Sequence, residues 1–376
     1  MKSAKSDFKK IPRSLTSNVP LAPLTTFHVG GEARFFIETR SIEEVTEALD
    51  FAQVHALPIF VLGGGSNILV SDRGFDGLVI ALRIQGITTE NHGASTFVTV
   101  GSGVVWDEFI IWTIEHGLKG LECMSGVPGT VGGAVVANLG CYGAQCSDTF
   151  THAEVVDIQD QRGALKILKK EECDFSYHDS LFGRLKGRYI IVRATFALST
   201  DPAAVPSYRD NRFDMTTLTK TIGHQPTQHD VRDAVLHVRE EKGSLIMKDR
   251  VSYKCAGSFF HMPFVSPETY GEVMKRARKL DAGKEKRLRP WAWKQPDGSY
   301  KLAPGFLLEY TEFQKGYVRG AVGISPRHTL TIINIDGARA SDIAQLARDM
   351  SDVVEKIFDI RLEREVEYVG DVERVE

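Results

Sequence analysis

Glycine is concentrated in one apolar part of this sequence, between residues 101 and 143. This part contains the segments VPGTVGG at 127–133 and NLGCYG at 138–143, and it is too apolar for a flexible linker. An earlier cluster, GGGSN at 63–67, follows a short apolar run. Glycines in core-like segments indicate backbone that packs closely against another strand or a flat ligand. The fold must therefore bring backbone very close to a neighbour at these places.

Local patterns in the first quarter of the chain predict both helix and strand. Ser41 and Glu44 have the spacing of a capping box, and the apolar positions that follow, up to Ala52, share one helical face. The apolar run 58–62 predicts a buried strand. Because this strand ends in the glycine cluster, its turn is a typical place for backbone amides to bind a phosphate.

Later patterns continue the mixture of elements. Apolar spacing over 231–238 predicts a helix, and a strong amphipathic pattern over 343–357 predicts another, with Ser341 as the candidate cap. Alternation over 360–368 predicts a strand with Glu365 on the face opposite the apolar side chains. Helices and strands in separate blocks indicate an α+β fold.

Composition narrows the class of protein. A chain of 376 residues suggests two or three domains, and a net charge of −3 favours neither nucleic acid nor a membrane surface as a partner. Five cysteines without a C-x-x-C pair indicate a reduced cytoplasmic chain with no structural zinc site. Residues 1–20 lack an apolar core and are expected to form a disordered tail, and the sequence contains no apolar run of membrane-spanning length.

The common nucleotide-binding motifs are missing. The sequence contains no P-loop, and both candidate dinucleotide fingerprints fail, because Trp106 and Ile68 stand where the third glycine is needed. The two glycine-rich segments could hold a nucleotide cofactor without a Rossmann fold. They could equally be tight turns in a β-rich core.

Eight segments, in this order along the chain, carry a resemblance to a known family. They are TTFHVG at 25–30, LGGGSNIL at 62–69, GLECMSGVPGTVGG at 120–133, NLGCYG at 138–143, FSYHDS at 175–180, AGSFF at 256–260, KLAPGFLL at 301–308 and LEREV at 362–366. Over about residues 20–370, the sequence resembles the UDP-N-acetylenolpyruvoylglucosamine reductase (MurB) family. Eight ordered matches make coincidence a poor explanation.

The resemblance implies an architecture. It consists of an FAD-binding fold of the vanillyl-alcohol-oxidase type in two subdomains, followed by a C-terminal α/β substrate-binding domain. The boundaries we expect are 21–83 and 84–240 for the FAD-binding subdomains, with a loop at 200–227, 241–367 for the substrate-binding domain, and 368–376 for a C-terminal segment. The region around Tyr208 resembles the tyrosine-bearing loop of the longer subtype of the family.

The resemblance also implies an activity. NADPH would reduce a non-covalent FAD, which would then pass hydride to the enolpyruvyl group of UDP-N-acetylglucosamine enolpyruvate, forming UDP-N-acetylmuramate for peptidoglycan synthesis and so for the cell wall. We expect a cytoplasmic, monomeric enzyme that binds this UDP-sugar but no nucleic acid, membrane or metal. Two alternatives stay open: a flavin-binding homologue with lost or altered turnover, and an oxidase of the same flavin fold.

Catalytic and substrate-binding roles follow residue by residue from the same resemblance. Ser258 matches the residue that donates a proton to the substrate carbon C2, and Glu365 matches a second acid. Without the resemblance, local patterns would predict a serine in a turn for Ser258 and a position on a solvated strand face for Glu365. Tyr208 and Lys242 match residues at the substrate phosphates. Trp293 aligns with an aromatic residue near the uracil, or it simply anchors its loop.

Cofactor-binding roles are expected for both glycine-rich segments. The candidates are Gly63, Gly64, Gly65, Ser66, Asn67, Pro128, Gly129, Gly132, Gly133, Asn138, Gly140 and Tyr142.

The sequence departs from the family at several site positions. His178 stands where the family has an arginine that stabilises developing negative charge, so His178 is a candidate catalytic residue if it is protonated. Alternatively, His178 packs beside Tyr177 and another cation such as Arg184 does this work. His261, Met262 and Arg364 also differ from the family pattern. These changes bear on rate and substrate use, and not on the flavin fold.

Overall fold

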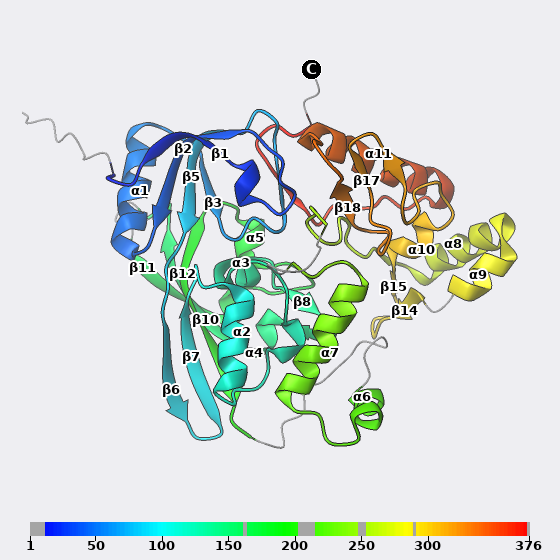
Figure 1. Ribbon diagram of the computed structural model, residues 1–376, viewed down its shortest axis with the longest axis horizontal. Helices are drawn as coiled ribbons and strands as arrows, with labels where there is room; N and C mark the ends of the chain where they lie inside the picture. The colour runs from blue at the N-terminus through cyan, green and yellow to red at the C-terminus, as the bar shows by residue number, and fades with distance from the viewer. Residues whose placement is uncertain (1–11, 161–163, 202–214, 247–252, 289–290, 374–376) are drawn as a thin grey trace, which may run out of the picture.

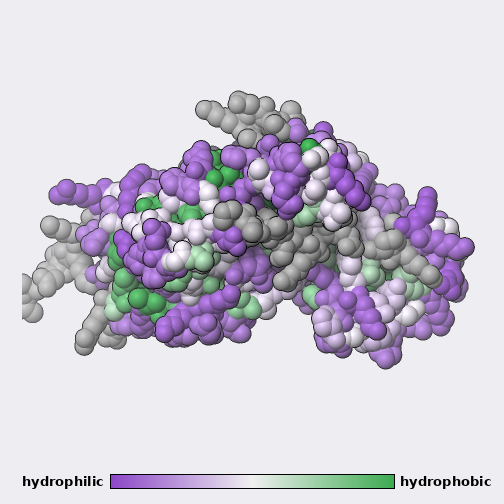
Figure 2. Space-filling view, turned by 90° about the horizontal axis from the view of Figure 1, so that it is seen from below, coloured by the Kyte–Doolittle hydropathy of each residue, from purple (hydrophilic) through white to green (hydrophobic). Residues whose placement is uncertain are grey.

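The computed structural model describes residues 12–160, 164–201, 215–246, 253–288 and 291–373. Two sheets form one side of the molecule, and the C-terminal part lies beside them (Figure 1). Viewed from below, a waist separates the C-terminal lobe from the larger one, and the exposed face is mainly hydrophilic (Figure 2). Within the described residues, no helix is both long and apolar enough to cross a membrane.

The first sheet has the strand order β1-β2-β5-β3 and is covered by helix α1. The first pair is antiparallel and the other two pairs are parallel. The elements of this region are β1 Thr16–Pro20, η1 Ala22–Leu24, β2 Glu32–Thr39, α1 Ile42–Val54, β3 Ile59–Leu62, β4 Ile68–Val70 and β5 Phe75–Leu82.

Three predictions can be compared with this sheet. The capping pattern is confirmed, since the Ser41 hydroxyl accepts the Glu44 N–H, although the Glu44 carboxylate turns to the N–H of Arg40 instead of Ser41. The strand over 58–62 exists, but β3 is an edge strand in which only Leu62 is buried. The disordered tail is wrong for 16–20, because β1 pairs with β2 and the half-buried Val19 packs on the sheet.

The second sheet has the order β11-β10-β12-β7-β6 and is antiparallel throughout. Its elements are β6 Ile87–His92, β7 Ser95–Gly101, β10 Phe150–Asp157, β11 Leu165–Lys169 and β12 Tyr189–Ser199. The glycine-rich stretch lies against its core face as short elements: α2 Trp106–Glu115, η2 Glu122–Met124, α3 Val131–Val136, β8 Gly140–Cys141, β9 Ala144–Gln145 and α4 Cys146–Thr149. The connection from β11 to β12 contains η3 Lys170–Glu172 and α5 Leu181–Arg184.

Two helices follow the second sheet. Helix α7, Gln228–Glu241, confirms the pattern over 231–238 and buries Val231 and Val235. Helix α6, Met215–Ile222, lies inside the segment expected to be a loop at 200–227, so that expectation is wrong for these residues.

The C-terminal part is built from short strands and helices around its own core. Its two small sheets have the orders β13-β15-β14 and β16-β17-β18. The elements are β13 Phe264–Val265, α8 Pro267–Leu280, α9 Ala282–Leu288, β14 Ala292–Lys294, β15 Tyr300–Leu302, α10 Pro304–Leu308, β16 Val318–Arg319, β17 Val322–Ile324, β18 Ile332–Asn334, α11 Ala340–Phe358 and β19 Glu367–Val369.

The amphipathic helix near the C-terminus is confirmed as α11, but its predicted cap is wrong. The helix begins at Ala340, so Ser341 lies inside the first turn. Asp72, from the first sheet's region, instead accepts the Ala340 N–H at 2.7 Å and the Ser341 N–H at 3.1 Å. A carboxylate accepts hydrogen bonds from the unpaired amides of the first helical turn, and its negative charge is stabilised by the positive end of the helix dipole. This contact ties the C-terminal domain to the N-terminal sheet.

The predicted strand over 360–368 is mostly wrong. Only β19 is a strand, and it returns to pair in parallel with β4 near the start of the chain, which also places the expected domain boundary at 367 inside a strand. Residues 360–366 are irregular, although Ile360, Leu362 and Val366 are buried as predicted. In Figure 1 this red segment runs back from the C-terminal lobe to the N-terminal sheets.

Candidate active site

The two glycine-rich segments, 63–67 and 128–133, lie directly against each other. A Cβ atom on Gly64 would come within 2.6 Å of the Gly129 Cα, and one on Gly63 within 2.9 Å of the Thr130 hydroxyl. The Ser66 hydroxyl donates to the Pro128 carbonyl at 3.0 Å. These glycines are therefore needed for close backbone packing, whatever else they bind.

The turn after β3 is the predicted anion-binding turn. Its carbonyls are used, because the N–H groups of Thr26 and Glu367 donate to the carbonyls of Gly65 and Asn67. In the part of the chain that the structure describes, no protein group accepts the amide protons of Gly64, Gly65 or Ser66. Backbone amides in such a turn fit the pyrophosphate of a dinucleotide.

Asn138 organises the second glycine-rich segment. It is buried with a left-handed backbone (φ 40°), and its side-chain amide donates to the Ser176 carbonyl at 2.6 Å. Its side-chain oxygen accepts the Ser147 N–H at 3.0 Å. The nearby His178 is also left-handed (φ 50°), a conformation that costs a non-glycine residue about 1 kcal/mol. Asn138 therefore holds the strained loop that carries His178.

Residues 259–261 and 363–365 pair as two antiparallel segments. The Glu365 N–H donates to the Phe259 carbonyl at 2.8 Å, and the His261 N–H donates to the Glu363 carbonyl at 2.9 Å. The Asn67 side chain donates to the Glu365 carbonyl at 3.2 Å. The structure therefore brings together the backbone next to Ser258, Glu365 and the predicted anion-binding turn.

The carboxyl group of Glu365 lies between two histidine rings. The His178 Nδ1 is 3.5 Å from one carboxyl oxygen, and the His261 Nδ1 is 3.9 Å from the other. The two ring centroids are 6.3 Å apart. His178 comes from the loop before α5, and His261 from the C-terminal domain, so the cluster joins two domains.

Burial controls the charges in this cluster. It raises the pKa of Glu365 to about 7, although Lys301 opposes this shift. Burial, with smaller contributions from His261 and Lys301, lowers the pKa of His178 to about 4. Burial also lowers the pKa of His261, while Glu363 and Asp179 oppose that change. Near pH 7 both histidines are therefore mainly neutral, and the short His178–Glu365 distance is not an ion pair.

This result bears on the two interpretations of His178. A neutral ring does not supply the fixed positive charge that a catalytic cation requires, so burial argues against the cationic role. The ring packs edge-on against Tyr177, with centroids 4.4 Å apart. The alternative cation, Arg184, is directed to the carboxylates of Asp174 and Asp179. A catalytic role of His178 stays a prediction, with a neutral ring.

A cation beside this cluster is Lys301, for which sequence patterns suggested no role although it opens one of the eight quoted segments. Its Nζ lies 3.5 Å from the centre of the Tyr177 ring and 5.5 Å from that of Phe264. Those two rings are 5.7 Å apart and come from different domains. Lys301 thus occupies an aromatic junction at the edge of the site.

The predicted substrate residues are distributed around the site. The Lys242 Nζ lies 4.9 Å from the centre of the Tyr142 ring, which joins a predicted substrate residue to a predicted cofactor residue. Trp293, in β14, is half-buried and pairs across the strand with Lys301. Tyr208 lies outside the described residues. The roles of all three stay predictions.

Gly132, Gly133 and Gly140 occupy separate parts of the glycine-rich stretch. Gly132 and Gly133 lie in the first turn of α3, where Gly132 N–H donates to the Ser102 carbonyl at 2.9 Å, and Gly140 begins β8. The buried Ser102 hydroxyl has no hydrogen-bond partner among the described residues. Ser102 is a further residue whose position only the fold reveals.

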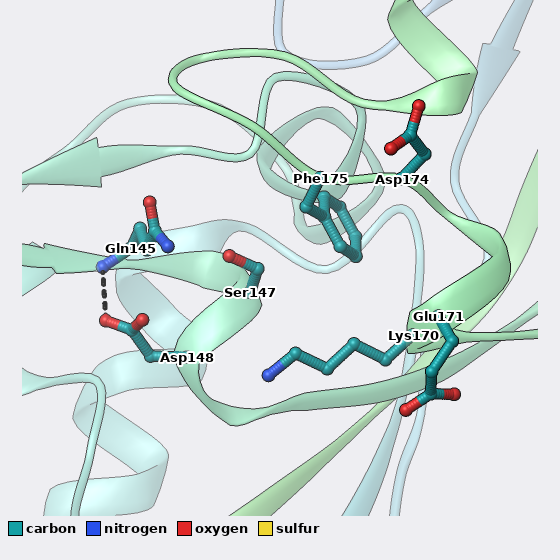
Figure 3. A pocket seen from close by; sticks show the side chains of 7 residues that line it. All are labelled: Gln145, Ser147, Asp148, Lys170, Glu171, Asp174 and Phe175. Carbon is teal, nitrogen blue, oxygen red and sulfur yellow. Dashed lines mark hydrogen bonds between the residues drawn. The ribbon is translucent and has the colours of Figure 1, made fainter. Parts of the chain in front are cut away.

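A cavity of about 420 Å³ is lined by residues of β9, α4 and the connection after β11. Its side chains mix charges of both signs, and Gln145 N–H bonds Asp148 at its edge (Figure 3). Lys170 and Phe175 reach it from the connection after β11. None of the residues that surround Glu365 lines this cavity, so it is separate from the cluster.

Comparison with known proteins agrees with this geometry. Residues 33–162 match the family described as FAD binding domain, and residues 249–369 match the C-terminal domain of UDP-N-acetylenolpyruvoylglucosamine reductase. These two matches define the class of the protein as an FAD-dependent oxidoreductase. They confirm the predicted α+β fold with a flavin-binding part and a C-terminal substrate-binding domain.

Full-length relatives identify the family. UDP-N-acetylenolpyruvoylglucosamine reductases from Thermobifida fusca and Ralstonia nicotianae are each 34% identical to the chain, covering 95% and 93% of it and 98% of each relative. The enzyme from Mycobacterium avium is 33% identical over 98% of the chain and 99% of that relative. The chain belongs to this family. The MurB structure from Thermus caldophilus, at 24% identity and a TM-score of 0.61 over 94% of the chain and 98% of that protein, shares the fold.

Proposed function

We propose that this protein reduces UDP-N-acetylglucosamine enolpyruvate to UDP-N-acetylmuramate, with NADPH as the reductant and a non-covalent FAD as the cofactor. Relatives named as this reductase align with the chain over 98% of their own length. The single structural observation that supports it best is the Asn67–Glu365 hydrogen bond, because it joins the anion-binding turn to the segment with the acid residue.

Each part of the site has a role in this reaction. Bound FAD would accept hydride from NADPH and supply it to the vinyl carbon of the substrate. The amides of Gly64, Gly65 and Ser66 would hold the cofactor's pyrophosphate. The Ser258 hydroxyl would protonate the neighbouring carbon, where negative charge develops, and the neutral Glu365 carboxyl would donate a hydrogen bond to the substrate's carboxylate.

Charge around the substrate is supplied by lysines. Lys242, at the end of α7, would bind the diphosphate, together with Tyr208, and Trp293 would pack near the uracil. Lys301 lies beside the acid cluster and would favour the developing negative charge. The proposal includes a cytoplasmic location, because both the reductant and the UDP-sugar are cytoplasmic metabolites. It also includes a monomer, and a net charge of −3 does not favour nucleic acid as a partner.

Anaerobic stopped-flow absorbance of the flavin tests the proposal. NADPH should bleach the FAD, and the enolpyruvyl UDP-sugar should restore its colour within one turnover. A flavin-binding homologue without turnover would show neither fast step. An oxidase would be reoxidised by oxygen and consume an alcohol or sugar, with no requirement for the enolpyruvyl group. Either result, or a protein that cannot be loaded with FAD, would overturn the proposal.

A further inference from the structure

The backbone of Glu365 is held by hydrogen bonds at both its N–H and its carbonyl, but these bonds do not fix its carboxyl group. The N–H is bound by Phe259 and the carbonyl by Asn67. The carboxyl group itself is directed between His178 and His261, with one Nδ1 atom near each oxygen. These separations exceed those of hydrogen bonds, as is common for catalytic groups before the substrate binds.

We propose that His261 positions Glu365, acting together with His178 as a neutral clamp on the two carboxyl oxygens. This inference rests on the proposed function and adds a residue to it. His178 belongs to the flavin-binding part and His261 to the C-terminal domain, so the clamp aligns Glu365 only when these two domains are in contact. Because neither ring carries a charge near neutral pH, the clamp adds no charge that would favour the ionised carboxylate, and the protonated carboxyl group can donate a hydrogen bond.

Other charged groups near the clamp support this arrangement. Lys301 lowers the pKa of Glu365, so the carboxyl group is protonated in spite of it, because of burial. Glu363 and Asp179 act on His261 and would favour its protonation, yet burial outweighs them. A permanent cation in place of either ring would add to Lys301 and favour the ionised carboxylate.

Three substitutions of His261 separate positioning from simple packing. His261→Asn keeps an N–H donor close to Nδ1, and His261→Leu removes the donor at similar size. We expect His261→Leu to slow reoxidation of reduced FAD by substrate about tenfold, the rate equivalent of one lost hydrogen bond. His261→Asn should stay within about threefold of the native rate. Reduction by NADPH should be unchanged in both.

The third substitution, His261→Lys, tests whether position 261 acts directly on the Glu365 carboxyl group. A fixed charge beside Glu365 should lower its pKa and move the alkaline limb of the reoxidation rate to lower pH by at least about one unit. In a Glu365→Gln background, neither His261→Leu nor His261→Lys should have a further effect. The matched control is His92→Leu, because the exposed His92 lies 3.7 Å from Glu90 in a similar pair away from the site.

The outcomes are decisive in both directions. Equal slowing of both half-reactions by His261→Leu, an unmoved limb in His261→Lys, or effects that persist in Glu365→Gln would each overturn the clamp. A readout without substrate separates this failure from failure of the proposed function. In the FAD-loaded protein, His261→Lys should remove the pH-dependent change in melting temperature that Glu365→Gln otherwise produces. If the wild type does not turn over, that measurement still tests the clamp.

Discussion

Replacing Glu365 by glutamine should stabilise this protein at alkaline pH and not at acidic pH. Burial raises the pKa of Glu365 from an ordinary 4.5 to about 7, and its side chain is only 23% exposed. Below pH 4.5 the carboxyl group is neutral in both folded and unfolded chains. As pH rises, the unfolded chain loses the proton first, so the folded state is progressively destabilised until the folded group also ionises near pH 7.

The difference between these two pKa values corresponds to about 3 kcal/mol of unfolding free energy above pH 7. Glutamine has the shape of the neutral acid and no proton to lose, so Glu365→Gln should recover this energy. With roughly 2.1 cal/mol/K per residue, the 376 residues unfold with an entropy of roughly 0.8 kcal/mol/K. The gain is then about 4 °C in melting temperature when the chain unfolds as one unit.

Calorimetry or flavin fluorescence across pH 4.5–9 would measure this difference in the FAD-loaded protein. The matched control is Glu363→Gln, since Glu363 is two residues away and exposed. The control should follow the wild type at every pH. A Glu365→Gln gain that is constant with pH, or one equalled by the control, would show that Glu365 is not held neutral, and the argument from burial would fail.

Three further predictions concern chemistry and cofactor binding. Ser258→Ala should leave flavin bleaching by NADPH intact and slow reoxidation by substrate ~10²–10⁴-fold, measured by stopped flow; equal loss in both steps would contradict its role as the acid. Gly64→Ala should lower bound FAD per protein, because its Cβ would collide with backbone 2.6 Å away, whereas Gly271→Ala, where the structure has open space, should bind FAD normally. Lys301→Met should raise the pKa of Glu365, because Lys301 lowers that pKa in the native protein, and so move the alkaline limb of the reoxidation rate to higher pH. A limb that stays in place or moves to lower pH would show that Lys301 does not act on Glu365.

The parts of the fold that sequence patterns predicted well are those stabilised locally. Helix α1 follows its own cap at Ser41 and an apolar face that reaches Ala52. Helix α11 has its apolar stripe in 19 residues of continuous sequence. In both, the apolar residues that form the buried face lie within a few turns of one another, so periodicity was enough to predict the helix, and for α1 the cap at Ser41 was also predicted correctly.

The wrong predictions depend on partners that are distant in sequence. The cap of α11 is Asp72, which lies 268 positions before the amide it binds. Strand β1 exists only because it pairs with β2. Residues 360–366 are irregular, and the bonds of Glu365 go to two distant places: its N–H donates to the Phe259 carbonyl, and its carbonyl accepts from Asn67. Local patterns do not contain this information, because the alternation of apolar and polar residues predicts which side chains are buried but not which segment they pair with.

The site shows the same division. Ordered motifs were enough to propose Ser258 and Glu365, which the fold brings to neighbouring backbone. The motifs also contain Lys301, and His261 departs from them, but the sequence alone suggests no role for either residue. Their roles follow from the position of His261 beside Glu365 and of Lys301 over the Tyr177 ring. Charge was the least predictable property. His178 was expected to be a cation if it is catalytic, and only its burial in the folded protein shows that it is neutral.

The two histidines at this site have a common physical consequence. An arginine at position 178 would place a permanent charge within reach of Glu365 and favour the ionised carboxylate, which accepts hydrogen bonds and donates none. A neutral His178 and a neutral His261 add no charge that would favour the ionised carboxylate, and a pKa of about 7 keeps a large share of Glu365 protonated at neutral pH, while Lys301, over the Tyr177 ring, keeps a positive charge at the edge of the same cluster. In an arginine–glutamate pair, the positive charge would ionise the carboxyl group and so prevent it from donating a proton. Here the positive charge comes from Lys301 and the proton from Glu365. The departure at 178 is consistent with an active reductase in which charge stabilisation has moved to Lys301.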